Sequence, residues 1–92
     1  MGYGSSSGTI LAVAKNPYSY HQTKLQELLR RIRLDAELRQ EDLAKRLGVP
    51  QSFVSKYESG ERRLDVVEIR QICGAIGISL ADFARMFEES LK

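Results

Sequence analysis

The sequence is poor in the residues that build disulfide, metal and catalytic sites. It has one cysteine, Cys73, so no internal disulfide can form, and a single thiol fits a reducing compartment. It has one histidine, His21, and it lacks both the His and Cys spacing of a zinc site and the Gly-rich loop of a phosphate site. These absences predict that the chain is not an enzyme and carries no metal or cofactor.

Long apolar runs are also missing. No uncharged apolar run approaches the ~20 residues needed to cross a bilayer, and the short run 10–14 has no basic leader of the kind found in signal peptides. The 92 residues are 42% hydrophobic and 28% charged, which is typical of one soluble domain with a single core. We therefore expect a cytoplasmic protein with no membrane partner.

The first 20 residues differ from the rest of the chain. Residues 1–8 are rich in Gly and Ser and predict a flexible leader. Residues 9–14 favour a short extended arm that packs on the body or exchanges between protomers, with disorder as the alternative. Asn16-Pro17 indicates a turn. We therefore divide the chain into a leader, residues 1–20, and a folded domain, residues 21–92.

Apolar residues in the folded domain recur at helical spacing, and no alternating pattern is long enough to build a sheet. This predicts an all-α fold. One helix is expected from about Gln22 to Asp35, and its inward face carries Leu25, Leu28, Leu29 and Ile32.

Capping residues mark the starts of two further helices. Asp65 with Glu68 opens one, and Ser79 with Asp82 opens the last. The apolar face expected on the first consists of Val66, Val67, Ile69, Ile72, Cys73 and Ile76, where Cys73 is expected to be a buried core thiol. The apolar stripe expected on the last consists of Leu80, Phe83, Ala84, Phe87 and Leu91.

The last helix has more apolar surface than a short terminal helix needs. Met86 and Leu91 are therefore expected to form a dimer contact, with closure of the monomer's own core as the equal alternative.

Residues 39–60 predict two short helices joined by a tight turn. Gly48 ends the first helix, because Gly adopts the left-handed conformation without strain, and Pro50 suits the start of the second. Val49 is expected to pack between the two helices. The positions expected to face the body are Leu43, Ala44, Leu47, Val54 and Tyr57.

The outward face of the second short helix is unusual for a surface helix, which normally carries Glu and Lys at salt-bridge spacing. Gln can pair bidentately with adenine, Ser can bond to several bases, and an exposed apolar side chain can touch a thymine methyl group. We therefore expect this helix to read bases in a DNA major groove, with an ordinary polar face as the alternative. The expected base contacts are Gln51, Ser52, Phe53, Ser55 and Lys56.

Positive charge gathers around the expected reading helix. Residues 21–63 hold ten Lys or Arg against seven Asp or Glu, whereas residues 64–92 hold three against five. Arg62 and Arg63 follow the reading helix in a loop, and Gln40 lies at the start of the preceding helix, so all three are expected phosphate contacts. The alternative for the two arginines is a solvated loop.

Over about residues 22–90 the chain resembles the phage-repressor-like, or Xre-type, helix-turn-helix family. The residues that carry the resemblance are Gln40, Leu43, Ala44, Gly48, Val49, Gln51, Val54, Ser55, Glu58 and Gly60. It implies a compact five-helix, lambda-repressor-like domain that binds DNA, usually as a homodimer. Glu37 and Arg39 depart from the pattern, because the family often has Gly at the first position and a capping residue at the second.

The resemblance also implies a structural ion pair between Arg33 and Glu58. Glu58 follows the core position Tyr57, where an unpaired carboxylate would be costly to bury. The alternative is that both side chains are exposed and unrelated.

Together these patterns predict a sequence-specific double-stranded DNA-binding protein. We expect a transcriptional regulator of the repressor kind, acting as a homodimer at the nucleoid. The alternative is an antitoxin or adaptor-type module on the same fold, whose last helix holds a protein partner.

Overall fold

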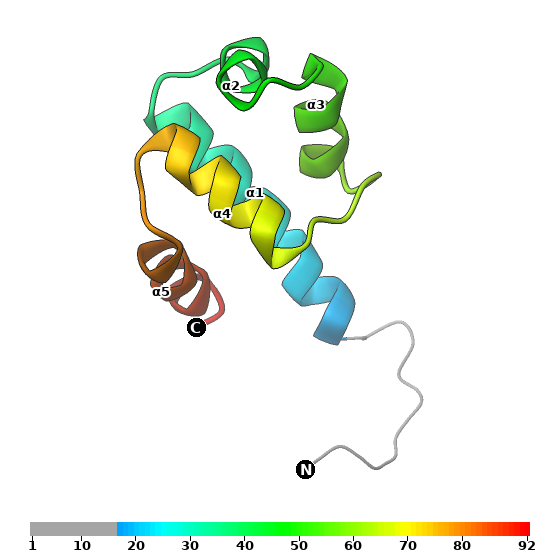
Figure 1. Ribbon diagram of the computed structural model, residues 1–92. Coiled ribbons are helices and arrows are strands. Elements are labelled where there is room, and N and C mark those ends of the chain that lie inside the picture. The colour runs from blue at the N-terminus through cyan, green and yellow to red at the C-terminus, as the bar shows by residue number, and fades with distance from the viewer. Residues whose placement is uncertain (1–16) are drawn as a thin grey trace.

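The computed structural model describes residues 17–92, which form five α-helices (Figure 1). The all-α prediction is confirmed: residues 17–92 contain no strand. The leader predicted for residues 1–8 and the arm predicted for residues 9–14 lie outside the described residues. The helices are α1 (Pro17–Asp35), α2 (Gln40–Leu47), α3 (Gln51–Ser59), α4 (Val66–Ile76) and α5 (Leu80–Ser90).

The start of α1 differs from the prediction. The helix begins at Pro17, five residues before the expected Gln22, and so takes in the end of the segment assigned to the leader. Proline suits the first helical position, because its fixed φ is helical and a backbone N–H there would have no partner within the helix. The added turn is supported by Thr23, whose hydroxyl donates to the Ser19 carbonyl at 3.0 Å.

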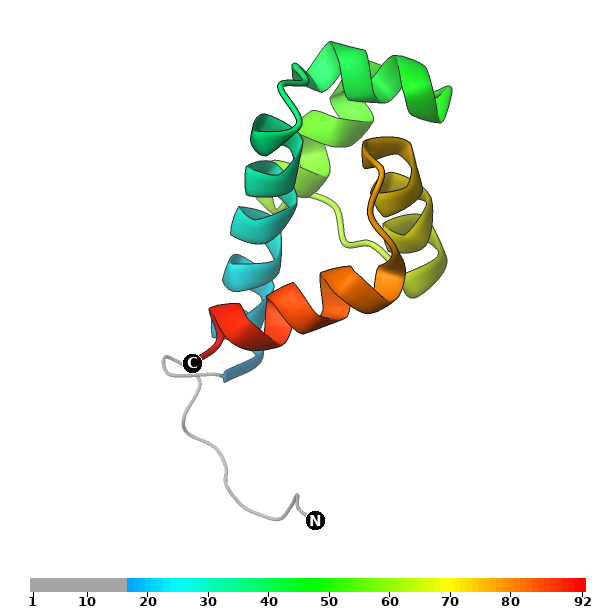
Figure 2. The ribbon, with the colours of Figure 1, turned by 90° about the vertical axis from the view of Figure 1, so that its left-hand side faces the viewer.

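The helices pack in a closed ring in the order α1, α3, α2, α4, α5 and back to α1. In both ribbon views α2 lies at one end of the molecule and α5 at the other (Figures 1 and 2). Side chains from all five helices fill the middle of the ring. The largest fully buried ones are Tyr57, Leu29, Leu43, Ile72, Val54 and Cys73.

The predicted helix caps of α4 and α5 are confirmed. Asp65 accepts from the Glu68 backbone N–H at 2.8 Å, while Glu68 accepts from the Asp65 N–H at 2.9 Å. Ser79 accepts from the Asp82 N–H at 3.0 Å. These bonds satisfy backbone donors that the first helical turns leave without partners, so both helices begin where their caps lie.

Three residues expected on inward faces are exposed instead. Val66 and Val67 are 61% and 60% exposed, and Ala84 is exposed as well. The core side of α4 is set by Ile72 and Cys73, and Val67 lies on the opposite side of the helix. Val66 is the first residue of α4 and precedes these core residues by more than a turn. The prediction of a continuous apolar face was therefore wrong at the start of the helix.

Candidate nucleic-acid interface

The connection between α2 and α3 is a tight turn with the predicted geometry. Gly48 has φ +71°, in the left-handed region, and Val49 donates its N–H to the Ala44 carbonyl at 3.0 Å. The Val49 side chain is partly buried against the core. Pro50 then starts α3 with φ −65°. These features hold α3 at a fixed angle to α2.

The core side of α3 is formed by Val54 and Tyr57, which are fully buried. The opposite side carries Gln51, Ser52 and Lys56, which are exposed, and Ser55, which is partly buried. Polar side chains therefore project outward from the first two turns of α3.

Phe53 was expected to be exposed on the outward face of α3, and it is not. Its side chain is partly buried against the core, and its ring meets the Tyr57 ring edge-on at 5.6 Å between centroids. The Arg62 guanidinium lies 4.7 Å from the centroid of the Phe53 ring. Phe53 therefore packs α3 onto the body and onto the following loop.

Arg33 of α1 and Glu58 of α3 form a bidentate ion pair. Arg33 Nε and Nη2 donate to the two Glu58 carboxylate oxygens at 2.7 and 2.9 Å. The two side chains are only 6% and 4% exposed. Arg33 Nη1 also donates to the Leu38 carbonyl at 2.8 Å. The hydrogen bond to Glu58 is the main reason that the pKa of Arg33 is raised, so the guanidinium stays charged.

A second polar link joins this ion pair to the outward face of α3. Gln40 Nε2 donates to Glu58 Oε1 at 3.1 Å, and Gln51 Nε2 donates to Gln40 Oε1 at 3.1 Å. A continuous hydrogen-bonded chain thus runs from Arg33 to Gln51. The sequence predicts a phosphate contact for Gln40 and does not predict its contact with Gln51. The contact could have been inferred from the sequence, because a Gln at the start of α2 can reach a Gln at the start of α3 across a tight turn.

The loop after α3 places its two arginines differently. Arg62 stacks on Phe53 and forms an ion pair with Glu68, the residue that closes the cap of α4. Arg63 is exposed. Gly60, with φ +90°, lies against the side-chain amide of Gln26, so the loop turns sharply as it leaves α3.

Helix α5 offers less exposed apolar surface than its sequence suggests. Met86 is partly buried and packs against the core of its own chain, and Leu91 is also partly buried. In both ribbon views α5 lies far from α2 (Figures 1 and 2).

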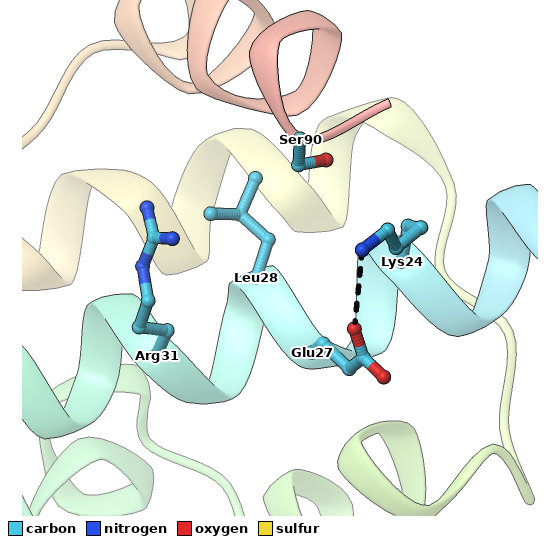
Figure 3. Close-up of a pocket in the computed structure, with 5 residues that line it drawn as sticks. All are labelled: Lys24, Glu27, Leu28, Arg31 and Ser90. Atoms are coloured by element: carbon cyan, nitrogen blue, oxygen red, sulfur yellow. Dashed lines mark ion pairs between the residues drawn. The ribbon is translucent and has the colours of Figure 1, made fainter. Parts of the chain in front are cut away.

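A shallow hollow lies between α1 and the end of α5, away from the α2–α3 turn (Figure 3). It is lined by Lys24, Glu27, Leu28, Arg31 and Ser90, and Lys24 pairs with Glu27 at 3.8 Å. Its volume of about 160 Å³ is below the ~300–1,000 Å³ of ligand sites.

Residues 17–92 bring together no group of three or more His, Cys, Asp or Glu that could hold a metal ion. Within the same residues, no helix has the length and apolar character needed to cross a membrane.

The chain is similar in sequence and in structure to known proteins. The helix-turn-helix family pattern matches residues 29–83. An XRE-family like protein from Pseudomonas syringae pv. tomato str. DC3000 is 38% identical, with a TM-score of 0.79, over 89% of this chain and 100% of that one. No curated protein sequence matches the chain.

The restriction-modification controller protein C.Esp1396I is also similar. Its tetramer, solved in complex with its natural 35 base-pair operator, is 27% identical with a TM-score of 0.72. The match covers 79% of this chain and 97% of that one. The family match spans more than half of the sequence and coincides with the observed turn and with the packing of α3 on the body, so this chain belongs to the Xre-type helix-turn-helix family.

Proposed function

We propose that this protein is a transcriptional regulator that binds double-stranded DNA sequence-specifically, with α3 in the major groove. The observation that carries the proposal is the structure of α3. One side is fixed to the body by Val54, Tyr57 and the Arg33–Glu58 pair, while the other presents exposed hydrogen-bonding side chains. A helix that is rigidly held and polar on its outer side is what base reading in a groove requires.

Gln51, Ser52 and Lys56 are the proposed base readers, because all three are exposed on the same side of α3. A Gln carboxamide matches the N6 and N7 edge of adenine, and a Lys matches guanine. Ser55, which is partly buried, is proposed to approach the sugar or the base edge. Phe53 is left out of this set, because its ring is occupied by Tyr57 and Arg62.

Gln40 is proposed to position Gln51. Its amide oxygen accepts from Gln51 Nε2, while its amide nitrogen donates to Glu58. A fixed amide on the inner side restricts the orientation of the Gln51 carboxamide before DNA arrives. This restriction reduces the conformational entropy lost on binding.

Arg62 and Arg63 are the proposed phosphate contacts. Both lie in the loop that leaves α3, where helix-turn-helix domains approach the DNA backbone. Arg62 also stacks on Phe53 and forms an ion pair with Glu68.

We further propose that the protein acts as a homodimer. One α3 reads only a few base pairs, whereas two copies related by a twofold axis read half-sites about 34–36 Å apart on one face of DNA. Support comes from C.Esp1396I, which was solved as a tetramer on its operator.

The test is selection of binding sites from a randomised duplex library, followed by affinity measurements across a salt series. We expect one enriched sequence and an affinity that falls steeply with salt. Arg63→Ala should weaken binding to all sequences and reduce the salt slope by about 1. Arg30→Ala, an exposed arginine on α1, is the matched control and should leave the slope unchanged.

Absence of both enrichment and binding at low salt would overturn the proposal. That outcome would favour the alternative function, in which the same fold is an antitoxin or adaptor that binds a protein partner.

A further inference from the structure

Arg62 is held from two sides in the loop that joins α3 to α4 (Figure 1). Its Cζ lies 4.7 Å from the centroid of the Phe53 ring, and its Nη2 donates to Glu68 Oε2. The Arg62 side chain is nevertheless 41% exposed. Within residues 17–92 the guanidinium makes no other hydrogen bond, and a guanidinium has five N–H donors, so most of its donors are available to a ligand.

The two oxygens of the Glu68 carboxylate have different partners. Oε1 accepts from the Asp65 backbone N–H at 2.9 Å and completes the cap of α4, while Oε2 accepts from Arg62. The Glu68 backbone N–H donates back to the Asp65 carboxylate at 2.8 Å. The cap therefore fixes Glu68, and Glu68 in turn fixes Arg62.

Arg62 lies at one flank of the outward face of α3. Residues two positions apart in an α-helix are about 200° apart around its axis, so Phe53 and Gln51 lie on opposite flanks, with the exposed polar side chains between them. On one flank, Gln40 accepts from Gln51. On the other flank, Phe53 and Glu68 hold Arg62. The outward face of α3 thus has a fixed hydrogen-bonding group on each side.

We propose that Glu68 is a positioning residue for DNA binding, because it holds the Arg62 guanidinium on the Phe53 ring in the orientation that donates to a DNA phosphate beside α3. The inference rests on the proposed function and adds Glu68 and Phe53, which act through Arg62. An unrestrained arginine loses rotamer entropy when DNA fixes it, whereas Arg62 has lost part of that entropy before DNA arrives.

The negative charge of Glu68 gives the proposal a sign that can be tested. A carboxylate near DNA repels the phosphates, so removal of its charge alone should strengthen binding. If Glu68 positions Arg62, the same removal should weaken binding instead. Charge and positioning therefore predict opposite changes in affinity.

The experiment is titration of a mixed-sequence duplex at low salt with the full chain and with Glu68→Gln. Glutamine also serves in capping boxes, so its amide oxygen keeps the cap of α4 while its NH2 group, a donor, faces Arg62. Glu61→Gln removes the same charge at an exposed position of the neighbouring loop and is the matched control. We expect Glu68→Gln to weaken binding about 3- to 10-fold, and Glu61→Gln to leave it unchanged or strengthen it.

A double-mutant cycle separates positioning from a purely structural role. In the Arg62→Ala background, Glu68→Gln should no longer weaken binding, because the side chain that it positions is gone. Weakening that persists in this background would show that Glu68 acts through the cap of α4, and it would overturn the inference. Binding by Glu68→Gln that is as tight as binding by Glu61→Gln would overturn it too.

A second measurement observes Arg62 in the free protein. NMR relaxation of the Arg62 Nε–H bond should report a rigid side chain in the wild type and a mobile one in Glu68→Gln, and equal mobility would overturn the inference. A wild type that binds no duplex at low salt would overturn the proposed function and this inference with it. Normal wild-type binding with undiminished binding by Glu68→Gln would overturn this inference alone.

Discussion

Arg33 and Glu58, 25 residues apart in sequence, meet as a nearly fully buried bidentate ion pair that joins α1 to α3. The pair is the inner end of a hydrogen-bonded chain whose outer end is Gln51. The position of the proposed reading helix therefore depends on a contact with α1, a helix distant in sequence.

Glu58→Ala should lower the free energy of unfolding by about 3–5 kcal/mol, because it leaves the Arg33 guanidinium buried without its carboxylate. Urea unfolding measures the change. Glu89→Ala breaks an exposed pair with Lys92 and should cost at most about 1 kcal/mol. If the two variants lost similar stability, the buried pair would not hold α3 as we argue.

Gln51→Ala should weaken binding to the selected operator by about 1–3 kcal/mol and relax preference at one base pair. Gln40→Ala should have a smaller effect in the same direction, because it removes only the support of Gln51. A double-mutant cycle should give a coupling energy of about 0.5–3 kcal/mol. Gln22→Ala, in α1, is the control. Additive effects would show that Gln40 does not act through Gln51.

Tyr57→Phe should raise the free energy of unfolding at neutral pH by about 1 kcal/mol. The Tyr57 hydroxyl is buried and has no hydrogen-bond partner among the described residues, so its removal relieves a desolvation cost without leaving a new group unpaired. Tyr20→Phe, at a half-exposed position, should change little. A loss of stability in Tyr57→Phe would mean that the hydroxyl has a partner in solution.

Stability should fall at alkaline pH. Burial raises the pKa of Cys73 from 9.0 to about 11, and burial also raises the pKa of Tyr57 above its ordinary 10.0. The unfolded chain loses these protons first, so the stability that is fully present below pH 9.0 decreases as pH rises towards 11. Urea midpoints across this range should show a shallower fall in Tyr57→Phe above pH 10.0. An equal fall of the urea midpoint in the wild type and in Tyr57→Phe would show that Tyr57 does not contribute to the loss of stability.

Glu37→Gly should stabilise the protein by about 0.5–1 kcal/mol. Glu37 has φ +60°, which costs a non-Gly residue about 1–2 kcal/mol, and Gly avoids that cost while losing more entropy on folding. Glu27→Gly, at an exposed position inside α1, should instead destabilise by about 1 kcal/mol. Thermal unfolding should show a raised melting temperature for Glu37→Gly and a lowered one for Glu27→Gly. A lowered melting temperature in both variants would contradict the strain at Glu37.

The sequence by itself determined the elements that local chemistry specifies. The all-α class, the turn at Gly48 and Pro50 and the caps at Asp65 and Ser79 could be predicted, because helical periodicity, left-handed glycine and capping bonds involve residues close in sequence. The start of α3 followed for the same reason, because Pro50 suits the start of a helix. The start of α1 was missed, because Asn-Pro also favours a turn and nothing local distinguishes the two outcomes.

The tertiary structure decided which side chains contact each other and which remain exposed. Gln40 and Gln51 meet, Phe53 turns inward under Arg62, and Val66 and Val67 remain uncovered. Each outcome depends on where neighbouring helices end and how they cross, and no single segment contains that information. The helical pattern gives the direction of a side chain from its own helix axis, but only the packed ring of helices decides whether another element lies there to meet it.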